Sequence, residues 1–305
     1  MSIGLVLTAA PSATVVDDLV RDARAAAALR IHSAWISQQF AHDAIGLAAL
    51  VGREVPEIAV GTSVVPIYGR HPLNVATQAQ TAQAATRGRF TLGIGLGAKS
   101  FVEPVFGVPH KNTATYLREY LTVLRGVFDT GSVDFAGETL TARTPLPATV
   151  PGSADIEILV GALSPRALAV TGELADGTLT FLAGPRALSE VIVPALTRAA
   201  GGAPRKVVAA VSAVVTDDVA RAREIAEQRF AFYDTIPSYS RIIESNGSTK
   251  AADLFVAGDE DTVAAELRRY LDAGATDLVL AQTDLLDDAD RDRTWRLLGS
   301  LAKAG

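Results

Sequence analysis

Short runs of aliphatic and β-branched residues alternate along the whole chain with longer runs of helical period. This alternation is typical of repeated strand and helix units around a parallel sheet. Each strand segment is apolar along most of its length, as expected of a strand that is covered on both faces. The strands are predicted at residues 3–7, 34–37, 57–65, 90–96, 157–162, 178–182, 207–215 and 277–282. Eight strands with interposed helices favour a closed (β/α)8 barrel over a doubly wound sheet.

Helical segments lie between these strands, among them residues 16–29, 72–86, 116–128, 165–174 and 262–273. No linker separates them, and 49% of the 305 residues are hydrophobic, which is enough for a sizeable core. Barrels of this length commonly form one domain. We therefore expect residues 1–305 to be a single α/β domain, a (β/α)8 TIM barrel with insertions at its C-terminal face.

Two stretches are longer than the strand–helix connections of a minimal barrel. Residues 131–155 contain "VDFAGETLT", which predicts a hairpin with Gly137 at its turn, and a proline-rich exit. Residues 230–255 are richer in aromatic side chains than the rest of the chain and follow the seventh strand. That position predicts a cap over the ligand-binding face of the barrel, with packing on the outside as the alternative.

Composition excludes several classes of function. The net charge is −6, and no block of Lys and Arg provides the surface that nucleic acid needs. Cysteine is absent, which excludes disulfides and thiol nucleophiles, and the four histidines lack the spacing of metal ligands. The N-terminus has no basic region, and no stretch is long and apolar enough for a membrane span. We expect a soluble, cytoplasmic protein with no metal site and neither nucleic acid nor a membrane as a partner.

The motif "GIGLGA" at residues 93–98 matches the form of a dinucleotide-binding fingerprint. Such a fingerprint should open a helix, yet "KSFVEPVFGVPHKN" follows, with two prolines, and predicts none. Two interpretations then stay open. The glycines allow close packing of the strand, or Gly97, Ala98, Lys99 and Ser100 let backbone and ammonium groups approach a ligand at its end.

The stretch "LVGALSPRALAV" predicts a well-defined helix start. Ser164 is a good N-cap residue, and Pro165 suits the first helical position. The free N–H groups and positive dipole of such a start can bind a phosphate or carboxylate. An ordinary capped helix would carry the same residues.

Several longer stretches share their order with a known family: "SAWISQQF", "EIAVGTSVVPIYGRHPLNVATQAQTAQAATRGRFTLGIGLG", "FGVPHKNTATYLREYLTVLRGVF", "VGALSPRALAVTGELADGTLTF" and "VAGDEDTVAAELRRYLDAGATDLVLA". Together they resemble the bacterial-luciferase-like superfamily, and more narrowly its branch that uses the deazaflavin coenzyme F420. The resemblance implies a (β/α)8 barrel, usually a homodimer, that holds a flavin-type ring at the C-terminal ends of its strands. FMN is the alternative cofactor.

The resemblance also implies roles for particular residues. The third strand would end in a bulge with a non-prolyl cis peptide at Ser63–Val64, which supports one face of the ring. Two further segments would hold the side chain and phosphate of the cofactor, with Lys99 pairing with a negative group. Their residues are Gly97, Ala98, Lys99 and Ser100 after the fourth strand, and Gly161, Ala162, Leu163 and Ser164 after the fifth.

One pair of residues departs from the family pattern. Several deazaflavin-dependent dehydrogenases carry an acidic residue and a histidine at the end of the second strand, where this chain has Gln38 and Gln39. A glutamine amide can orient a ligand but cannot serve as a general acid or base. We therefore expect hydride transfer from the reduced cofactor to an activated C=C or C=N bond, with Gln38 and Gln39 as the candidate catalytic residues.

Two alternatives to this reaction stay open. One is an FMN-linked monooxygenase of the same superfamily, and the other is a barrel that binds the cofactor without catalysis. Phe232, Tyr233 and Tyr239 are the candidate contacts for a small, apolar substrate, although a packed cap would use the same residues.

Overall fold

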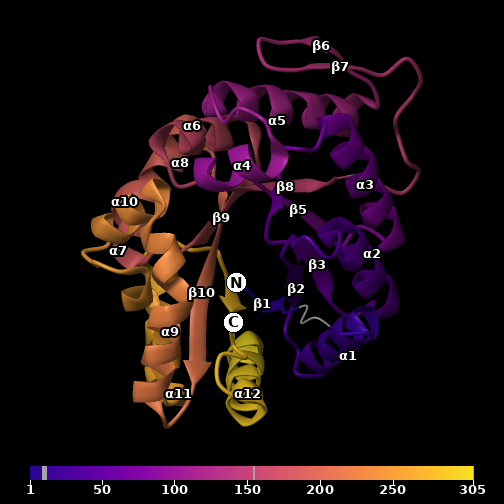
Figure 1. The fold of residues 1–305 in the computed structure, drawn as a ribbon. Helices are drawn as coiled ribbons and strands as arrows, with labels where there is room; N and C mark the ends of the chain where they lie inside the picture. The colour runs from indigo at the N-terminus through magenta and orange to yellow at the C-terminus, as the bar shows by residue number, and fades with distance from the viewer. Residues whose placement is uncertain (9–11, 154, 305) are drawn as a thin grey trace.

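Eight parallel strands close into a barrel in the computed structural model, which describes residues 1–8, 12–153 and 155–304 (Figure 1). The barrel strands are β1 (Ser2–Leu7), β2 (Ser33–Ile36), β3 (Ala59–Thr62) continued by β4 (Val65–Pro66), β5 (Phe90–Gly95), β8 (Glu157–Gly161), β9 (Gly177–Phe181), β10 (Lys206–Val215) and β12 (Asp277–Ala281). Each pairs with its neighbours in that order, and β12 pairs with β1 to close the ring. The predicted (β/α)8 fold is confirmed.

Helices surround the strands, most of them as an outer ring (Figure 1). They are α1 (Val15–Ala28), α2 (Ala44–Glu54), α3 (Pro72–Ala85), α4 (Lys99–Phe106), α5 (Thr113–Thr130), α6 (Pro165–Leu174), α7 (Pro185–Ala187), η1 (Leu188–Ile192), α8 (Val193–Ala199), α9 (Val219–Asp234), α10 (Pro237–Ser245), η2 (Ala251–Leu254), α11 (Glu260–Asp272) and α12 (Asp288–Ala304). The helix predicted at 165–174 is confirmed residue for residue, and the other four differ by one to three residues at an end. Among the described residues, no helix combines the length and hydropathy needed to cross a membrane.

The barrel interior is filled around Trp35 of β2. Its indole N–H donates to the hydroxyl of Ser33 at 2.9 Å. A Cβ on Gly61 would lie 2.6 Å from the Trp35 ring, so a glycine at this position of β3 gives the indole its space. Aliphatic side chains from the surrounding strands complete this inner cluster: Leu159, Leu179, Val208, Ala210 and Val279. They form the base on which the cavity rests.

The third strand is interrupted where the sequence predicts one continuous strand at 57–65. The peptide bond between Ser63 and Val64 is cis, although no proline follows it, and β4 begins only at Val65. The position that the family resemblance implies for this bond is confirmed. The continuous strand was wrong because the β-branched residues that favour a strand continue through the bend.

The predicted hairpin is confirmed. Strands β6 (Asp134–Ala136) and β7 (Thr141–Arg143) pair antiparallel, and the Gly137 N–H donates to the Leu140 carbonyl at 2.9 Å. The hairpin lies outside the ring of helices, beyond α5 (Figure 1). The buried carboxylate of Glu119 on α5 closes the turn, since it accepts hydrogen bonds from the N–H groups of Glu138, Thr139 and Leu140.

The segment after "GIGLGA" corrects a prediction. Helix α4 begins at Lys99, directly after the motif, although the two prolines predicted no helix there. Pro104 lies inside the last turn of this helix, which ends two residues later, before Gly107, so little helix follows the missing N–H. Gly107 ends it in the left-handed conformation, with φ +65°. The motif is still no dinucleotide fingerprint, since the fold is a closed barrel.

The second insertion returns to the barrel. After β10 the chain forms α9, α10 and η2, and then β11 (Val256–Gly258) pairs in parallel with Ala213–Val215 at the end of β10. Residues from α9 and α10 line the cavity described below, so the predicted cap over the C-terminal face is confirmed.

Candidate functional site

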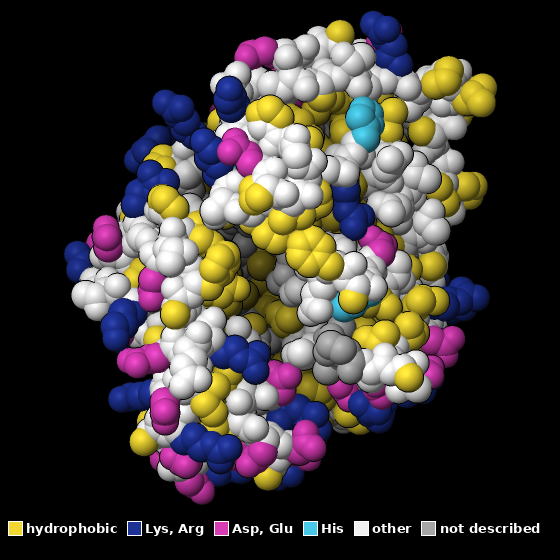
Figure 2. Space-filling model, viewed as in Figure 1, with side chains coloured by type: hydrophobic (Ala, Val, Ile, Leu, Met, Phe, Trp, Pro, Cys, Tyr) yellow, Lys and Arg dark blue, Asp and Glu magenta, His cyan; other side chains and the backbone are white. Residues whose placement is uncertain are grey.

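A cavity of about 1150 Å³ opens at the carboxyl ends of the strands (Figure 2). Each of the eight barrel strands contributes a residue of its own or the one directly after it: Val6, Ser37, Ser63, Gly95, Gly161, Leu179, Ala210 and Ala281. Figure 2 shows a hollow with hydrophobic side chains on its walls and rim, while most charged groups lie around the periphery of this face. This is the end at which barrels of this class bind their ligands.

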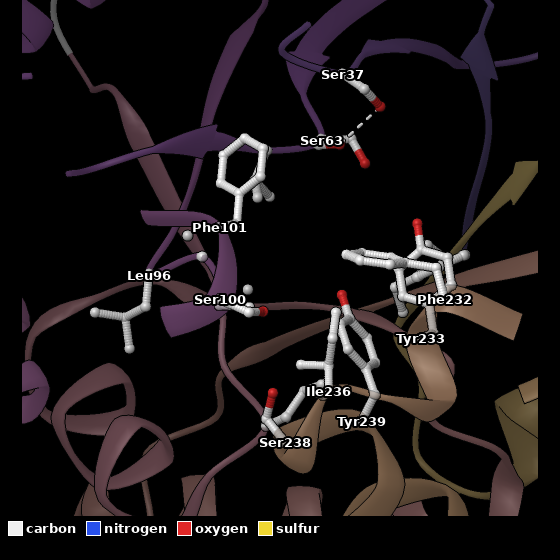
Figure 3. A pocket seen from close by; sticks show the side chains of 18 of the residues that line it. Ser37, Ser63, Leu96, Ser100, Phe101, Phe232, Tyr233, Ile236, Ser238 and Tyr239 are labelled. Carbon is white, nitrogen blue, oxygen red and sulfur yellow. Dashed lines mark hydrogen bonds between the residues drawn. The ribbon is translucent and has the colours of Figure 1, made fainter. Parts of the chain in front are cut away.

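One wall is the bend between β3 and β4. The Ser37 hydroxyl donates to the Ser63 carbonyl at 2.8 Å and so connects the end of β2 to the bend (Figure 3). Thr62 secures the other side, where its hydroxyl donates to the Gly93 carbonyl at 2.8 Å and accepts from the Gly93 N–H at 2.9 Å. The bend is therefore held from both neighbouring strands.

The glycines of β5 make room for this bend. A Cβ on Gly93 would collide with the Thr62 carbonyl, and one on Gly95 would lie 2.7 Å from a methyl group of Val64. The interpretation that these two glycines allow neighbouring residues to pack closely against the strand is confirmed. Val64 therefore lies over β5 and forms part of the cavity wall.

A second wall is formed by the starts of α4 and α6. Gly97, with φ +68°, precedes Ala98, Lys99 and Ser100, and all four line the cavity. The Lys99 ammonium lies 3.9 Å from the Glu103 carboxylate, and with 67% of the Lys99 side chain exposed this pair contributes little to stability.

At the start of α6, the Ser164 hydroxyl accepts from the Ala167 N–H at 3.3 Å, so the predicted N-cap is confirmed. Gly161, Leu163 and Ser164 line the cavity. Ala162 is fully buried and does not line it. The two segments implied by the resemblance therefore meet at one cavity, apart from Ala162.

The third wall is aromatic and comes from α9 and α10. Phe232, Tyr233 and Tyr239 line the cavity together with Phe181 of β9, and Figure 3 shows the three insertion residues facing it from one side. The Tyr233 ring centre lies 5.3 Å from that of Phe181 and 5.0 Å from that of Tyr239. Burial raises the pKa of both tyrosines, so their phenols stay protonated at neutral pH and can donate hydrogen bonds.

The two candidate glutamines differ in placement. The Gln38 amide donates to the carbonyls of Gln39 and His42 at 2.6 and 2.7 Å, and its oxygen accepts from Arg70 at 2.9 Å and from the Ala44 N–H at 3.1 Å. Gln39 is exposed and lines the cavity, whereas Gln38 does not line it. Gln38 thus holds the loop that presents Gln39.

Sequence reasoning missed several residues of this cavity. Gln282, at the end of β12, lines it with a buried amide oxygen that has no hydrogen-bond partner among the described residues. Arg229 on α9 and Arg241 on α10 line it too. For Gln282 the signal was its position at the end of a predicted strand. Among the residues that the structure describes, no group of three or more His, Asp or Glu side chains could hold a metal ion.

Comparison with known proteins agrees with this geometry. The sequence model of the luciferase-like monooxygenase family matches residues 1–277, and the chain belongs to this family. An uncharacterised protein of Mycobacterium tuberculosis is 27% identical over 253 residues, which cover 77% of this chain and 74% of the relative. The 5,10-methylenetetrahydromethanopterin reductase of Methanopyrus kandleri is 26% identical over 294 residues, which cover 81% of this chain and 83% of the relative.

Solved structures share the fold. The coenzyme F420-dependent tetrahydromethanopterin reductase of Methanopyrus kandleri superposes with a TM-score of 0.79 at 24% identity, covering 98% of this chain and 97% of that one. The oxygenating constituent of 3,6-diketocamphane monooxygenase from Pseudomonas putida, in complex with FMN, has a TM-score of 0.73 at 20% identity, covering 99% and 97%. Both deazaflavin and flavin enzymes therefore occur on this fold.

Proposed function

We propose that the protein is an oxidoreductase that uses the deazaflavin coenzyme F420 and reduces an activated C=C or C=N bond of a small organic substrate. The observation that carries the proposal is the arrangement of the cavity. The bend at Ser63–Val64 lies on one side, the starts of α4 and α6 on another, and an aromatic wall faces them. The reductase from Methanopyrus kandleri, a relative over most of the chain, is a supporting comparison.

The cavity fits a tricyclic cofactor together with a substrate. Its volume of about 1150 Å³ exceeds the roughly 300–1,000 Å³ of ordinary small-molecule sites. Val64 offers an apolar surface to a ring. The residues that would hold the side chain and phosphate are Gly97, Ala98, Lys99, Ser100, Gly161, Leu163 and Ser164.

When bound, the reduced deazaflavin would supply a hydride, and the proton that completes the reduction of the C=C or C=N bond would come from water or from another residue. The residues of this chain orient and shield the reactants. Val64 and Phe181 give the cavity apolar walls, and the Gln39 amide can hold a polar atom of the substrate. The phenols of Tyr233 and Tyr239 stay neutral and can donate hydrogen bonds to a carbonyl or imine group. The substrate would thus be held for transfer without a carboxylate base at the end of β2.

A fluorescence titration of the purified protein with F420 and FMN, side by side, tests this proposal. Micromolar or tighter binding of F420 alone, followed by oxidation of reduced F420 in the presence of electrophilic alkenes or imines, is the expected result. Tighter binding of FMN, with oxygen consumption, would replace the proposal with a monooxygenase. Binding without turnover across the panel would indicate a cofactor-binding protein, and binding of neither would overturn the proposal.

A further inference from the structure

The cavity carries an excess of positive charge in a chain whose net charge is −6. Its charged lining residues are three basic side chains and two acidic ones: Lys99, Arg229, Arg241, Glu103 and Asp284. Lys99 and Glu103 form an ion pair at 3.9 Å. Within the described part of the chain, the guanidinium groups of Arg229 and Arg241 make neither an ion pair nor a hydrogen bond.

Both arginines lie beside the aromatic wall. Arg229 precedes Phe232 and Tyr233 by three and four residues on α9, so the three side chains share one face of the helix, and all of them line the cavity. Arg241 follows Ser238 by three residues on α10, and these two also line it. The insertion therefore presents an apolar, aromatic surface together with two free cations.

A second apolar surface lies on the opposite side of the opening. Phe101 of α4 lines the cavity, and Figure 3 shows it across from Phe232 and Tyr233. Its ring centre is 5.7 Å from that of Phe40, whose side chain is 78% exposed. Phe232 is also exposed, at 58%. Phe40 itself does not line the cavity, so the facing apolar walls are Phe101 and Phe232, which are suited to a flat or elongated apolar ligand.

We propose that the substrate is an amphipathic anion, with a flat apolar body between Phe101 and the aromatic wall and a carboxylate or similar group bound by Arg229 and Arg241. Arginine suits this role because its planar fork donates two parallel hydrogen bonds to a carboxylate. The inference rests on the proposed function in taking this part of the cavity as the substrate side. The anion-binding property of the two arginines can be tested without cofactor.

The test uses two probes of similar shape and different charge: the anion 1-anilinonaphthalene-8-sulfonate and the neutral N-phenyl-1-naphthylamine. Their binding to the protein, with and without F420, is followed by fluorescence. The variant is the double substitution Arg229→Gln and Arg241→Gln. The matched control is Arg221→Gln with Arg223→Gln, two exposed arginines of α9 that do not line the cavity.

The expected result is that the double variant binds the anionic probe about tenfold more weakly, because two charge-assisted hydrogen bonds are lost, and binds the neutral probe as before. The control should match the original protein with both probes. Equal binding of the anionic probe by the double variant and the original protein overturns the inference. An equal loss of affinity for both probes also overturns it, because it would show that the substitutions disturb the packing of α9 and α10.

The phosphate-bearing side chain of the cofactor is the other possible source of the anion. If the double variant loses affinity for F420 and keeps affinity for the deazaflavin ring without that side chain, the arginines serve the cofactor and the inference is overturned. If neither deazaflavin binds to any variant, the proposed function fails, while the comparison of the two probes still tests the arginines.

Discussion

The hydroxyl group of Ser37 donates a hydrogen bond of 2.8 Å to the backbone carbonyl of Ser63, so the end of β2 holds the bend that forms one wall of the cavity. In Ser37→Ala this carbonyl loses its side-chain partner, and we expect the free energy of unfolding to fall by about 1–2 kcal/mol. Affinity for the cofactor should fall as well, because the wall is less firmly held. Urea unfolding and a cofactor titration measure the two effects.

Ser100→Ala provides the control for stability. Ser100 also lines the cavity, but its side chain makes no hydrogen bond with the described residues, so its removal should leave the unfolding midpoint unchanged. Equal unfolding of Ser37→Ala and the original protein would show that the bend does not depend on this bond.

The contact between Val64 and β5 gives a second prediction. In Gly95→Ala the new Cβ would lie 2.7 Å from a Val64 methyl group, and we expect a loss of about 1–3 kcal/mol of stability from overpacking. Removing that methyl group in Val64→Ala should relieve the clash, so the double variant should lose less than the sum of the two single variants. A double-mutant cycle by urea unfolding measures the coupling between the two positions. If the stability losses of the two single variants sum to that of the double variant, residues 64 and 95 are not in contact.

The carboxylate of Glu119 gives a prediction about pH. Burial raises its pKa, but hydrogen bonds from the Thr139 hydroxyl and from three backbone N–H groups outweigh that effect and leave the pKa below its ordinary value. The charged form therefore stabilises the fold fully above about pH 4.5, and this stabilisation is lost as pH falls through the folded-state pKa.

We expect Glu119→Gln to cost about 1–3 kcal/mol at pH 7, because an amide cannot accept at both of its ends. The difference from the original protein should narrow as the pH is lowered below 4.5 in thermal unfolding experiments. Glu138→Gln, an exposed substitution in the same turn, should show neither effect. A gap that stays constant with pH would mean that the charge of Glu119 is not involved.

The two glutamines after β2 should respond differently to alanine. Gln38→Ala removes hydrogen bonds to Gln39, His42, Ala44 and Arg70, and we expect a stability loss of about 1–3 kcal/mol. Gln39→Ala should leave stability unchanged and slow turnover by about 3- to 10-fold, the effect of one lost hydrogen bond. Thermal unfolding measures the first effect, and steady-state kinetics measures the second. Slower turnover in Gln38→Ala together with lower stability in Gln39→Ala would contradict both predictions.

The sequence was most informative where local chemistry determines the structure. Ser164 and Pro165 define the start of α6, and Gly137 marks the turn of the hairpin, because each satisfies a backbone requirement within a few residues. Helix α4 was missed because a proline was taken as a helix breaker, although Pro104 lies in the last turn, where little helix follows it. The interruption at Ser63–Val64 was located by family resemblance and not by propensity, since these residues favour an unbroken strand.

The sequence predicted the aromatic side chains of the cavity wall but not the two arginines beside them. Phe232 and Tyr233 were visible as an enrichment in a chain with few aromatic residues. Arg229 and Arg241 looked like ordinary surface charges of helices. They reach the cavity only because α9 and α10 return over the end of the barrel, and such a long-range path has no local signal in the sequence.

The pairing of β11 with the end of β10 determines how the cavity can change in evolution. Val256 lies opposite Ala213, so the chain that leaves the barrel after β10 comes back beside the same strand before it continues to α11 and β12. The intervening α9 and α10 lie outside the closed ring of strands. Their exposed, cavity-facing residues can be altered between these two fixed points without shifting the register of any barrel strand. Substitutions on the cavity side of α9 and α10 can therefore change the ligand preference and leave the bend and the helix starts as they are, while Ala226, Phe230 and Ile243 on the other side remain part of the core.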